Sequence, residues 1–266
     1  MRHIFSKKNR ALLGELVRTD FKLRYQNSVL GYAWSLLRPL FLFTILYVVF
    51  IKFLHVNYGI PHSAVYLLLG IVLWNFFNEM TVQSLGSIVG RGDLIRKIKI
   101  PRWTIVVSSS IAALINLTLN LVVVAIFMAL NHVDLLRSIL LLPLILLELY
   151  VLSLGLSLFL SAAFVKYRDI NYIWEVCLQG LFYMTPILYP ISKITNITLQ
   201  KILFLSPLSQ IIQDARYVTV SHQSATAYKV FGGGWHMFIP FGLTILAAII
   251  GIIYFRRESK YFAENI

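Results

Sequence analysis

Long apolar segments recur along this chain and limit its fold more than any other feature. A helix rises 1.5 Å per residue, so about 20 apolar residues cross the hydrocarbon layer of a membrane. Only 13% of the residues are charged, against roughly 25% in soluble domains. We therefore expect an all-α membrane protein, a single transmembrane domain over residues 1–266 with six transmembrane helices. The six segments are Trp34–Ile51, Ser63–Ile88, Ile105–Leu130, Ile139–Val165, Ile173–Leu188 and Met237–Phe255.

The net charge of +13 has two explanations, nucleic-acid binding or an excess of basic residues in cytoplasmic loops. Six spans put both termini on one side, and most basic residues then fall on that side. This distribution favours membrane topology over nucleic-acid binding, with cytoplasmic N- and C-termini. Eighteen of the 24 basic residues lie there: Arg2, Lys7, Lys8, Arg10, Arg18, Lys22, Arg24, Arg38, Arg91, Arg96, Lys97, Lys99, Arg102, Lys166, Arg168, Arg256, Arg257 and Lys260.

The N-terminal region is amphipathic rather than a cleavable signal, because charged residues interrupt it throughout. One face of a helix from Asn9 to Gln26 is apolar and another is basic. We expect residues 9–33 to lie along the membrane surface. The apolar face carries Leu13, Leu16, Val17 and Phe21, and the basic face carries Arg10, Arg18 and Lys22.

The segment 189–236 is irregular. Its apolar stretches are too short to span, Pro190 and Pro207 interrupt it, and glycines 232–234 end it. Apolar runs of this length are more often interfacial or re-entrant than spanning. The segment therefore either lies on the outer surface or dips back toward a pore.

The basic loop 91–102 reads as a short helix in which Asp93 caps the start and Pro101 ends the run. A positive-inside loop needs only charge, whereas this loop also has an apolar edge. The pattern favours a docking helix for a cytoplasmic partner. Its edge is Leu94, Ile95 and Ile98, and its basic residues are Arg96, Lys97 and Lys99.

Motifs for enzymatic chemistry are lacking in the sequence. No G-x-x-x-x-G-K-[ST] motif occurs, and no histidine pair has metal-ligand spacing. Cys177, the single cysteine, is expected to be a small buried residue. Glu148 lies deep in a predicted span, where it either takes part in a proton relay or pairs with a neighbouring span or subunit. The chain is expected to bind no cofactor or metal of its own.

Aromatic residues make up 14% of the chain, and several lie inside predicted spans. Packing or lipid contact is the ordinary explanation for each. A pore lined by aromatic faces and tyrosine hydroxyls would suit a glycan better than an ion.

The block RYQNSVLGYAWSLLRPL resembles the N-terminal signature of permease subunits of polysaccharide ABC exporters, the O-antigen, capsule and teichoic acid export family. The matching positions are Arg24-Tyr25, Leu30-Gly31, Trp34 and Pro39. Three further stretches resemble the family in order: LIRKIKIPR, FYMTPILYP and LSPLSQIIQDARY. The last departs from the family pattern, because Ser206 stands where asparagine is usual.

The resemblance implies a homodimeric permease in a bacterial cytoplasmic (inner or plasma) membrane that exports a lipid-linked polysaccharide. ATP and magnesium would bind a separate ABC ATPase subunit. The coupling helix would comprise Asp93, Leu94, Ile95, Arg96, Lys97 and Ile98. The gate helix, close to the lipid pyrophosphate, would use Arg18, Phe21, Lys22, Arg24 and Tyr25. The glycan channel would use Tyr47, Phe182, Tyr183 and Tyr189. The segment 189–236 would form short re-entrant helices on the extracytoplasmic side.

Three alternatives stay open at this point. A proton-coupled secondary transporter would depend on Glu148. A drug or small-lipid ABC permease would share the fold, although the N-terminal block speaks against it. A membrane glycosyltransferase would need a clustered carboxylate or metal motif, and the predicted loops contain none.

Overall fold

The computed structural model describes residues 11–19, 30–53, 59–97, 101–134 and 137–265, and every regular element in these ranges is helical. The long helices are α2 (Trp34–Tyr47), α3 (Ser63–Ser87), α5 (Trp103–Leu130), α6 (Leu142–Lys166), α7 (Ile170–Met184) and α11 (Ile239–Glu258). The short helices are α4 (Gly92–Lys97), α8 (Ile197–Leu205), α9 (Pro207–Thr219), α10 (Ala227–Phe231) and α12 (Phe262–Asn265). Single turns and one π-helix flank them: η1 (Gly31–Ala33), the π-helix η2 (Val48–Phe53), η3 (Val89–Arg91), η4 (Arg137–Leu141), η5 (Ile191–Lys193), η6 (Trp235–Phe238) and η7 (Ser259–Tyr261).

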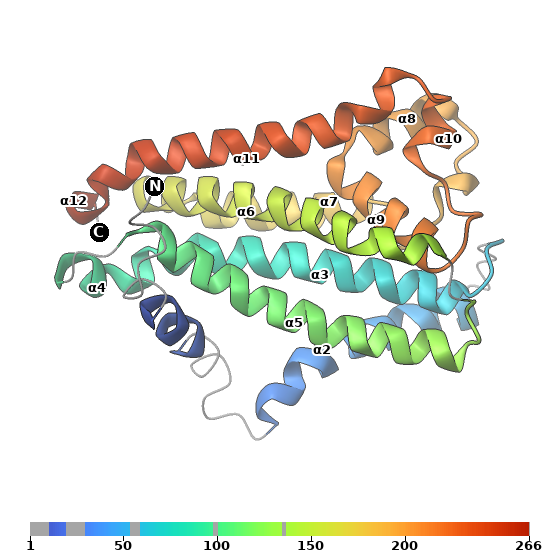
Figure 1. Ribbon diagram of the computed structural model, residues 1–266, viewed down its shortest axis with the longest axis horizontal. Coiled ribbons are helices and arrows are strands. Elements are labelled where there is room, and N and C mark those ends of the chain that lie inside the picture. The colour runs from blue at the N-terminus through green and yellow to red at the C-terminus, as the bar shows by residue number, and fades with distance from the viewer. Residues whose placement is uncertain (1–10, 20–29, 54–58, 98–100, 135–136, 266) are drawn as a thin grey trace.

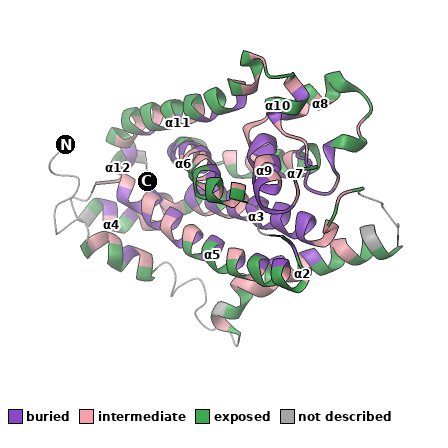
Figure 2. Ribbon diagram, turned by 45° about the vertical axis from the view of Figure 1, so that its right-hand side comes forward, coloured by how far each residue is buried: buried purple, intermediate pink, exposed green. Residues whose placement is uncertain are grey.

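Helix α3 is the centre of the bundle. It packs against α2, α5, α6, α7 and α9, while α11 lies on the far side of α6 (Figure 1). Its middle is buried on all sides, as Figure 2 shows by colour. Helices α4 and α12 lie at one end of the bundle, and α8, α9 and α10 lie at the other (Figure 1). We call these the α4 end and the α9 end.

All six predicted segments contain a helix, and the prediction of an all-helical membrane chain is confirmed. Four helical stretches are long and apolar enough to cross a membrane: Ser63–Ser87, Trp103–Leu130, Arg137–Lys166 and Trp235–Tyr261. Helices α2 and α7 have only 14 and 15 residues. The π-helix η2 follows α2 directly. The number of spans therefore stays a prediction beyond these four.

Prolines mark one boundary of α6 and one of α7. Helix α6 begins at Leu142, since Pro143 fits a first helical turn, where its missing N–H is not needed. The turn η4 runs directly into α6, so the predicted span Ile139–Val165 lies within the apolar helical stretch Arg137–Lys166. Helix α7 ends at Met184 rather than Leu188. Thr185 is extended there, with ψ 132°, because a residue before proline avoids the helical region.

Glycines allow α6 and α11 to pack in close contact. A Cβ atom at Gly155 would lie 2.5 Å from the Cα of Ala248, and one at Gly251 would overlap the carbonyl oxygen of Gly155. Small residues at such crossings let helix backbones approach in membranes, where tight van der Waals packing drives association. These positions therefore need glycine for steric reasons.

The segment 189–236 contains the three short helices α8, α9 and α10, joined by irregular chain. Asn196 caps α8 by accepting from the backbone N–H groups of Thr198 and Leu199 at 2.9 and 3.3 Å. Ser206 precedes α9, but its side chain makes no capping hydrogen bond. Gly232 ends α10 with φ 73°, in the left-handed region that favours glycine.

Arg216 of α9 fixes this segment to the bundle. It is completely buried. Its guanidinium donates to the carbonyl oxygens of Tyr66, Pro186 and Ile187 at 2.9, 2.6 and 2.8 Å, and it lies 3.7 Å from the centre of the Tyr66 ring. Three charge-assisted hydrogen bonds offset the cost of burying the cation. They join α9 to α3 and to the turn that follows α7.

Candidate functional site

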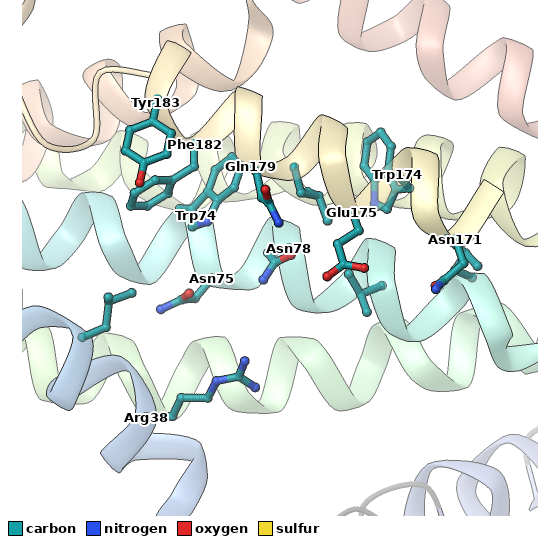
Figure 3. A pocket seen from close by; sticks show the side chains of 14 residues that line it. Arg38, Trp74, Asn75, Asn78, Asn171, Trp174, Glu175, Gln179, Phe182 and Tyr183 are labelled. Carbon is teal, nitrogen blue, oxygen red and sulfur yellow. The ribbon is translucent and has the colours of Figure 1, made fainter. Parts of the chain in front are cut away.

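A groove of about 740 Å³ runs between α3 and α7, and α2 lies at its edge (Figure 3). We call it the α3–α7 groove. Its walls are formed by residues at helical spacing on each helix, so one face of α3 lies opposite one face of α7. Its lining is Arg38, Leu42, Trp74, Asn75, Asn78, Val82, Leu85, Asn171, Trp174, Glu175, Leu178, Gln179, Phe182 and Tyr183.

Aromatic rings form one continuous part of the wall. Trp74 and Phe182 meet edge to face with centroids 5.4 Å apart, and Phe182 meets Tyr183 in the same way at 5.3 Å. Edge-to-face contacts of this kind hold rings in defined orientations. Tyr183 is nevertheless 70% exposed, so the wall offers an aromatic face and a hydroxyl to whatever enters the groove.

Polar side chains form the remainder of the lining. Figure 3 shows Asn75, Asn78, Gln179 and Glu175 along the groove, with Arg38 of α2 on the opposite side. Together they offer amide donors and acceptors, one carboxylate and one guanidinium. The Nε1–H of Trp174 is buried with no hydrogen-bond partner among the described residues. A groove with aromatic faces and many donors and acceptors can hold a large, uncharged, hydroxyl-rich ligand.

The neighbouring carboxylate, Glu79, has a structural partner instead. Its Oε1 accepts from Asn116 of α5 at 2.6 Å and from Gln83 at 3.2 Å. This contact ties α3 to α5 and leaves Asn75 and Asn78 as the polar residues of α3 that line the groove.

Two of the four residues expected in a glycan channel line the α3–α7 groove. These are Phe182 and Tyr183. Tyr47 packs on Phe43 with ring centroids 5.7 Å apart, and it does not line the groove. The Tyr189 hydroxyl donates to the carbonyl oxygens of Tyr183 and Met184 at 3.1 and 3.3 Å, which braces the end of α7. Burial raises the pKa of Tyr189, so this donor keeps its proton.

Sequence reasoning missed much of the groove. Asn75 and Asn78 belong to a visibly polar stretch of the second predicted span, and their spacing of three residues could have marked one helix face. Trp174 and Gln179 carried no such signal. Cys177 was expected to be buried, but it is exposed on α7. Its helix has a single buried residue, Leu178.

The predicted coupling loop forms η3 and α4 at the α4 end. Asp93 lies in the first turn of α4 rather than at its cap. A carboxylate in the first turn still stabilises the helix, because it interacts favourably with the helix dipole. Ile95 does not form an exposed edge: it packs into a buried cluster that includes Phe255 and Phe262. Asp93 and Arg96 are exposed and Leu94 is half-buried. Ile98 and the side chain of Lys97 lie outside the described residues.

The predicted gate helix is described over residues 11–19, which are helical and lie at the α4 end (Figure 1). Leu16 is buried, while Glu15 and Arg18 are exposed. This division agrees with an amphipathic helix. The remaining gate residues, Phe21, Lys22, Arg24 and Tyr25, lie outside the described residues.

Comparison with known proteins places these features in a family. A family model described as ABC-2 type transporter matches residues 11–220. The O-antigen export system permease protein RfbA of Klebsiella pneumoniae is 26% identical over 254 residues, which cover 95% of this chain and 94% of that protein. The protein of the same name from Myxococcus xanthus is 26% identical over 259 residues, covering 97% and 96%. The chain belongs to the ABC-2 type transporter family.

Proposed function

We propose that this chain is the transmembrane subunit of an exporter for a lipid-linked polysaccharide, of the O-antigen or teichoic-acid type. ATP, with magnesium, binds and is hydrolysed on a separate ABC ATPase subunit. Family membership supports ATP-driven transport over the proton-coupled alternative. The similarity to O-antigen export permeases favours a polysaccharide over a drug or a small lipid. The structural support for a glycan substrate comes from the residues that line the α3–α7 groove.

The groove suits a glycan because its chemistry matches a sugar chain. The C–H faces of sugars pack on aromatic rings such as Trp74, Phe182 and Tyr183. Sugar hydroxyls both donate and accept, as do the amides of Asn75 and Asn78. The groove is elongated along α3 and α7 rather than a closed pocket (Figure 3). A polymer can therefore pass through it one segment at a time.

Charge supports a cytoplasmic α4 end. The η3–α4 region contributes Arg91 and Arg96, and the ends of α6 and α11 add Lys166, Arg256 and Arg257. Basic residues collect on the cytoplasmic side of membrane proteins. In this orientation α2 and α7 complete six spans, and the segment 189–236 lies on the extracytoplasmic side in the bacterial cytoplasmic membrane.

Two helices at the α4 end take the cytoplasmic roles. Helix α4 couples the permease to the ATPase through its exposed face, which carries Asp93 and Arg96. Because Ile95 is anchored in the core beside Phe255 and Phe262, movement of α4 is transmitted to the ends of α3 and α11. The helix of residues 11–19 lies along the membrane surface as a gate, with Arg18 toward the lipid pyrophosphate.

A second copy of the chain completes the route. Helix α7 presents an exposed face at helical spacing, formed by Ile173, Val176, Cys177, Gly180 and Met184. Cys177 and Gly180 are small, as residues at helix contacts in membranes usually are. A Cβ atom at Gly180 would meet nothing within 4 Å in one copy. Pairing through this face places two α3–α7 grooves around one channel.

A tyrosine pair on α7 tests the groove. Tyr183 and Tyr172 are both 70% exposed, but only Tyr183 lines the groove. In cells that depend on this chain, Tyr183→Ala should lower surface polysaccharide severalfold, and Tyr172→Ala should leave it near the wild-type level. Equal amounts of each variant in the membrane are required for the comparison. Equal surface polysaccharide in the two variants would refute a glycan route along this groove.

A further inference from the structure

A second cavity lies on another side of the bundle, between α6, α9 and α11 at the α9 end. Its volume is about 890 Å³, and a neighbouring cavity of about 400 Å³ shares Glu148, Gln210 and Asp214 with it. We call the pair the α6–α11 cavity. It shares no lining residue with the α3–α7 groove, so the proposed glycan route does not account for it.

The walls of this cavity are apolar and face the outside of the bundle. Leu144 and Leu147 of α6 and Phe241 and Ile245 of α11 line it, and all four are exposed. Both helices are long and apolar enough to cross a membrane. An opening bordered by exposed leucine, isoleucine and phenylalanine on such helices faces acyl chains rather than water.

The floor is acidic and rich in oxygen atoms. Glu148 comes from α6, Gln210 and Asp214 from α9, and Thr244 from α11. Gln210 Nε2 donates to Asp214 Oδ2 at 2.5 Å. Three atoms are buried without a hydrogen-bond partner among the described residues: Glu148 Oε1, Gln210 Oε1 and Thr244 Oγ1.

Two of these unpaired atoms belong to well-buried side chains, whereas Glu148 is half-buried. Thr244 is 1% exposed and Gln210 is 8% exposed. A buried oxygen without a donor costs free energy, so the floor has acceptors for a ligand that brings donors. The side chains of Gln210 and Thr244 also lie beside the Glu148 carboxyl, and both can direct an N–H or O–H donor toward it.

Two basic residues near the cavity floor, Lys229 and Arg216, donate to backbone carbonyl oxygens. Lys229 lines the cavity, but its Nζ donates to the carbonyl oxygens of His222 and Ser224 at 2.6 and 3.1 Å. Arg216, also on α9, donates to the carbonyl oxygens of Tyr66, Pro186 and Ile187. Among the residues that the structure describes, neither carboxyl group of the floor forms an ion pair within 4.0 Å.

The floor lies toward the α9 end of both helices. Glu148 is eleven residues from Arg137, and Thr244 is nine residues from Trp235, the first residues of the two apolar helical stretches of 30 and 27 residues. Both positions are therefore in the half of each stretch that is nearer the α9 end, and the rest of each helix extends away from the floor as apolar surface.

We propose that the α6–α11 cavity binds a phospholipid with a primary ammonium headgroup. The ammonium donates its three N–H groups to Glu148, Asp214 and the Gln210 oxygen, and an acyl chain packs along Leu144 and Ile245. A bare metal ion would use the oxygen atoms but not the apolar walls. An anionic headgroup would be repelled by the two carboxylates.

The test compares headgroups on the purified full-length chain. Native mass spectrometry measures which lipid is retained after exposure to equal amounts of phosphatidylethanolamine, phosphatidylcholine and phosphatidylglycerol. Phosphatidylcholine is the matched control, because its quaternary ammonium has the charge but no N–H donor. Retention of phosphatidylethanolamine should exceed that of phosphatidylcholine by at least about tenfold, the effect of one or more charge-assisted hydrogen bonds.

Variants of the floor residues test whether these residues cause the preference for phosphatidylethanolamine. Glu148→Gln with Asp214→Asn should remove the preference, because both charged acceptors of the ammonium are lost. Asp134→Asn, at an exposed carboxylate near the same end, should leave it unchanged. If the double variant does not fold, Glu148→Gln alone decides.

Three results would overturn the proposal: equal retention of all headgroups, a preference for phosphatidylglycerol, or a preference that survives Glu148→Gln. Magnesium ion alone is tested in parallel. If magnesium raises the melting temperature of the wild type but not of Glu148→Gln, and removes the headgroup preference, the floor is a metal site instead.

Discussion

The guanidinium group of Arg216 occupies the space that a Cβ atom at Gly70 would fill. Arg216 Nη2, Cζ and Nε all lie against this position. Gly70 is in the middle of the central helix α3, and Arg216 is in α9, the helix of the irregular segment that enters the bundle. The absence of a side chain at Gly70 therefore lets a buried cation reach the carbonyl groups of Tyr66, Pro186 and Ile187.

Gly70→Ala should destabilise the protein, because the guanidinium must move and lose hydrogen bonds in a buried site. A hydrogen bond to a charged group contributes about 1.5–3 kcal/mol, so a drop of several degrees in melting temperature is expected. Gly86→Ala is the matched control in the same helix, because a Cβ atom there meets nothing within 4 Å. It should be neutral or stabilising. Equal melting temperatures for the two variants would contradict the role of the Arg216 contact.

The α6–α11 crossing makes a second stability prediction. Gly251→Ala places a methyl group against the backbone of Gly155, which cannot move as a side chain can. Overpacking of this kind costs about 1–3 kcal/mol. Gly242→Ala, in open space on the same helix, should have no such cost. Thermal unfolding in detergent measures both, and the account fails if Gly242→Ala is the more damaging change.

The coupling helix can be divided into an anchor and a docking surface. Ile95→Asp should lower thermal stability, because it puts a carboxylate among Phe255 and Phe262. Arg96→Glu should leave stability intact and weaken binding to the ATPase, because Arg96 is exposed. Thermal unfolding and co-purification with the ATPase separate the two effects. Normal ATPase binding by Arg96→Glu would remove this face of α4 from the docking surface.

Cys177 offers a direct test of the proposed dimer, since it is the only cysteine in the chain and is exposed on α7. A short bismaleimide reagent should link two copies in membranes and produce a band at twice the 30.5 kDa mass of one chain. Cys177→Ser should abolish the band. Moving the cysteine to the exposed face of α6, with Cys177→Ser and Leu147→Cys, should also give no dimer. A stronger dimer band from the α6 position would place the interface elsewhere.

The sequence predicted the helices better than the contacts between them. Apolar length located every long helix, and the Thr185-Pro186 pair could have given the true end of α7. Apolar length cannot say which face of a helix meets which neighbour. For that reason Ile95 was assigned to a docking edge although it is anchored in the core, and Cys177 was expected to be buried although it is exposed.

The same limit applies to the functional residues. Phe182 and Tyr183 were identified through a resemblance, whereas Asn75, Asn78 and Trp174 join them only because α3 and α7 face each other. Glu148 was expected either to relay protons or to pair with a neighbouring span or subunit. In the structure its Oε1 has no hydrogen-bond partner among the described residues. Packing between helices that are distant in the sequence determines which residues line the groove and which groups surround Glu148. A single sequence does not reveal that packing.

Transport by the purified complex tests the central claim most directly. The chain and a partner ATPase are reconstituted in liposomes that carry a lipid-linked O-antigen-type polysaccharide, with ATP supplied outside. For complexes whose ATPase faces outward, ATP should move the glycan into the vesicle and protect it from an added glycosidase, and a non-hydrolysable analogue should not. Glycan that stays fully accessible with ATP, or that becomes protected under a pH gradient without the ATPase, would contradict the account.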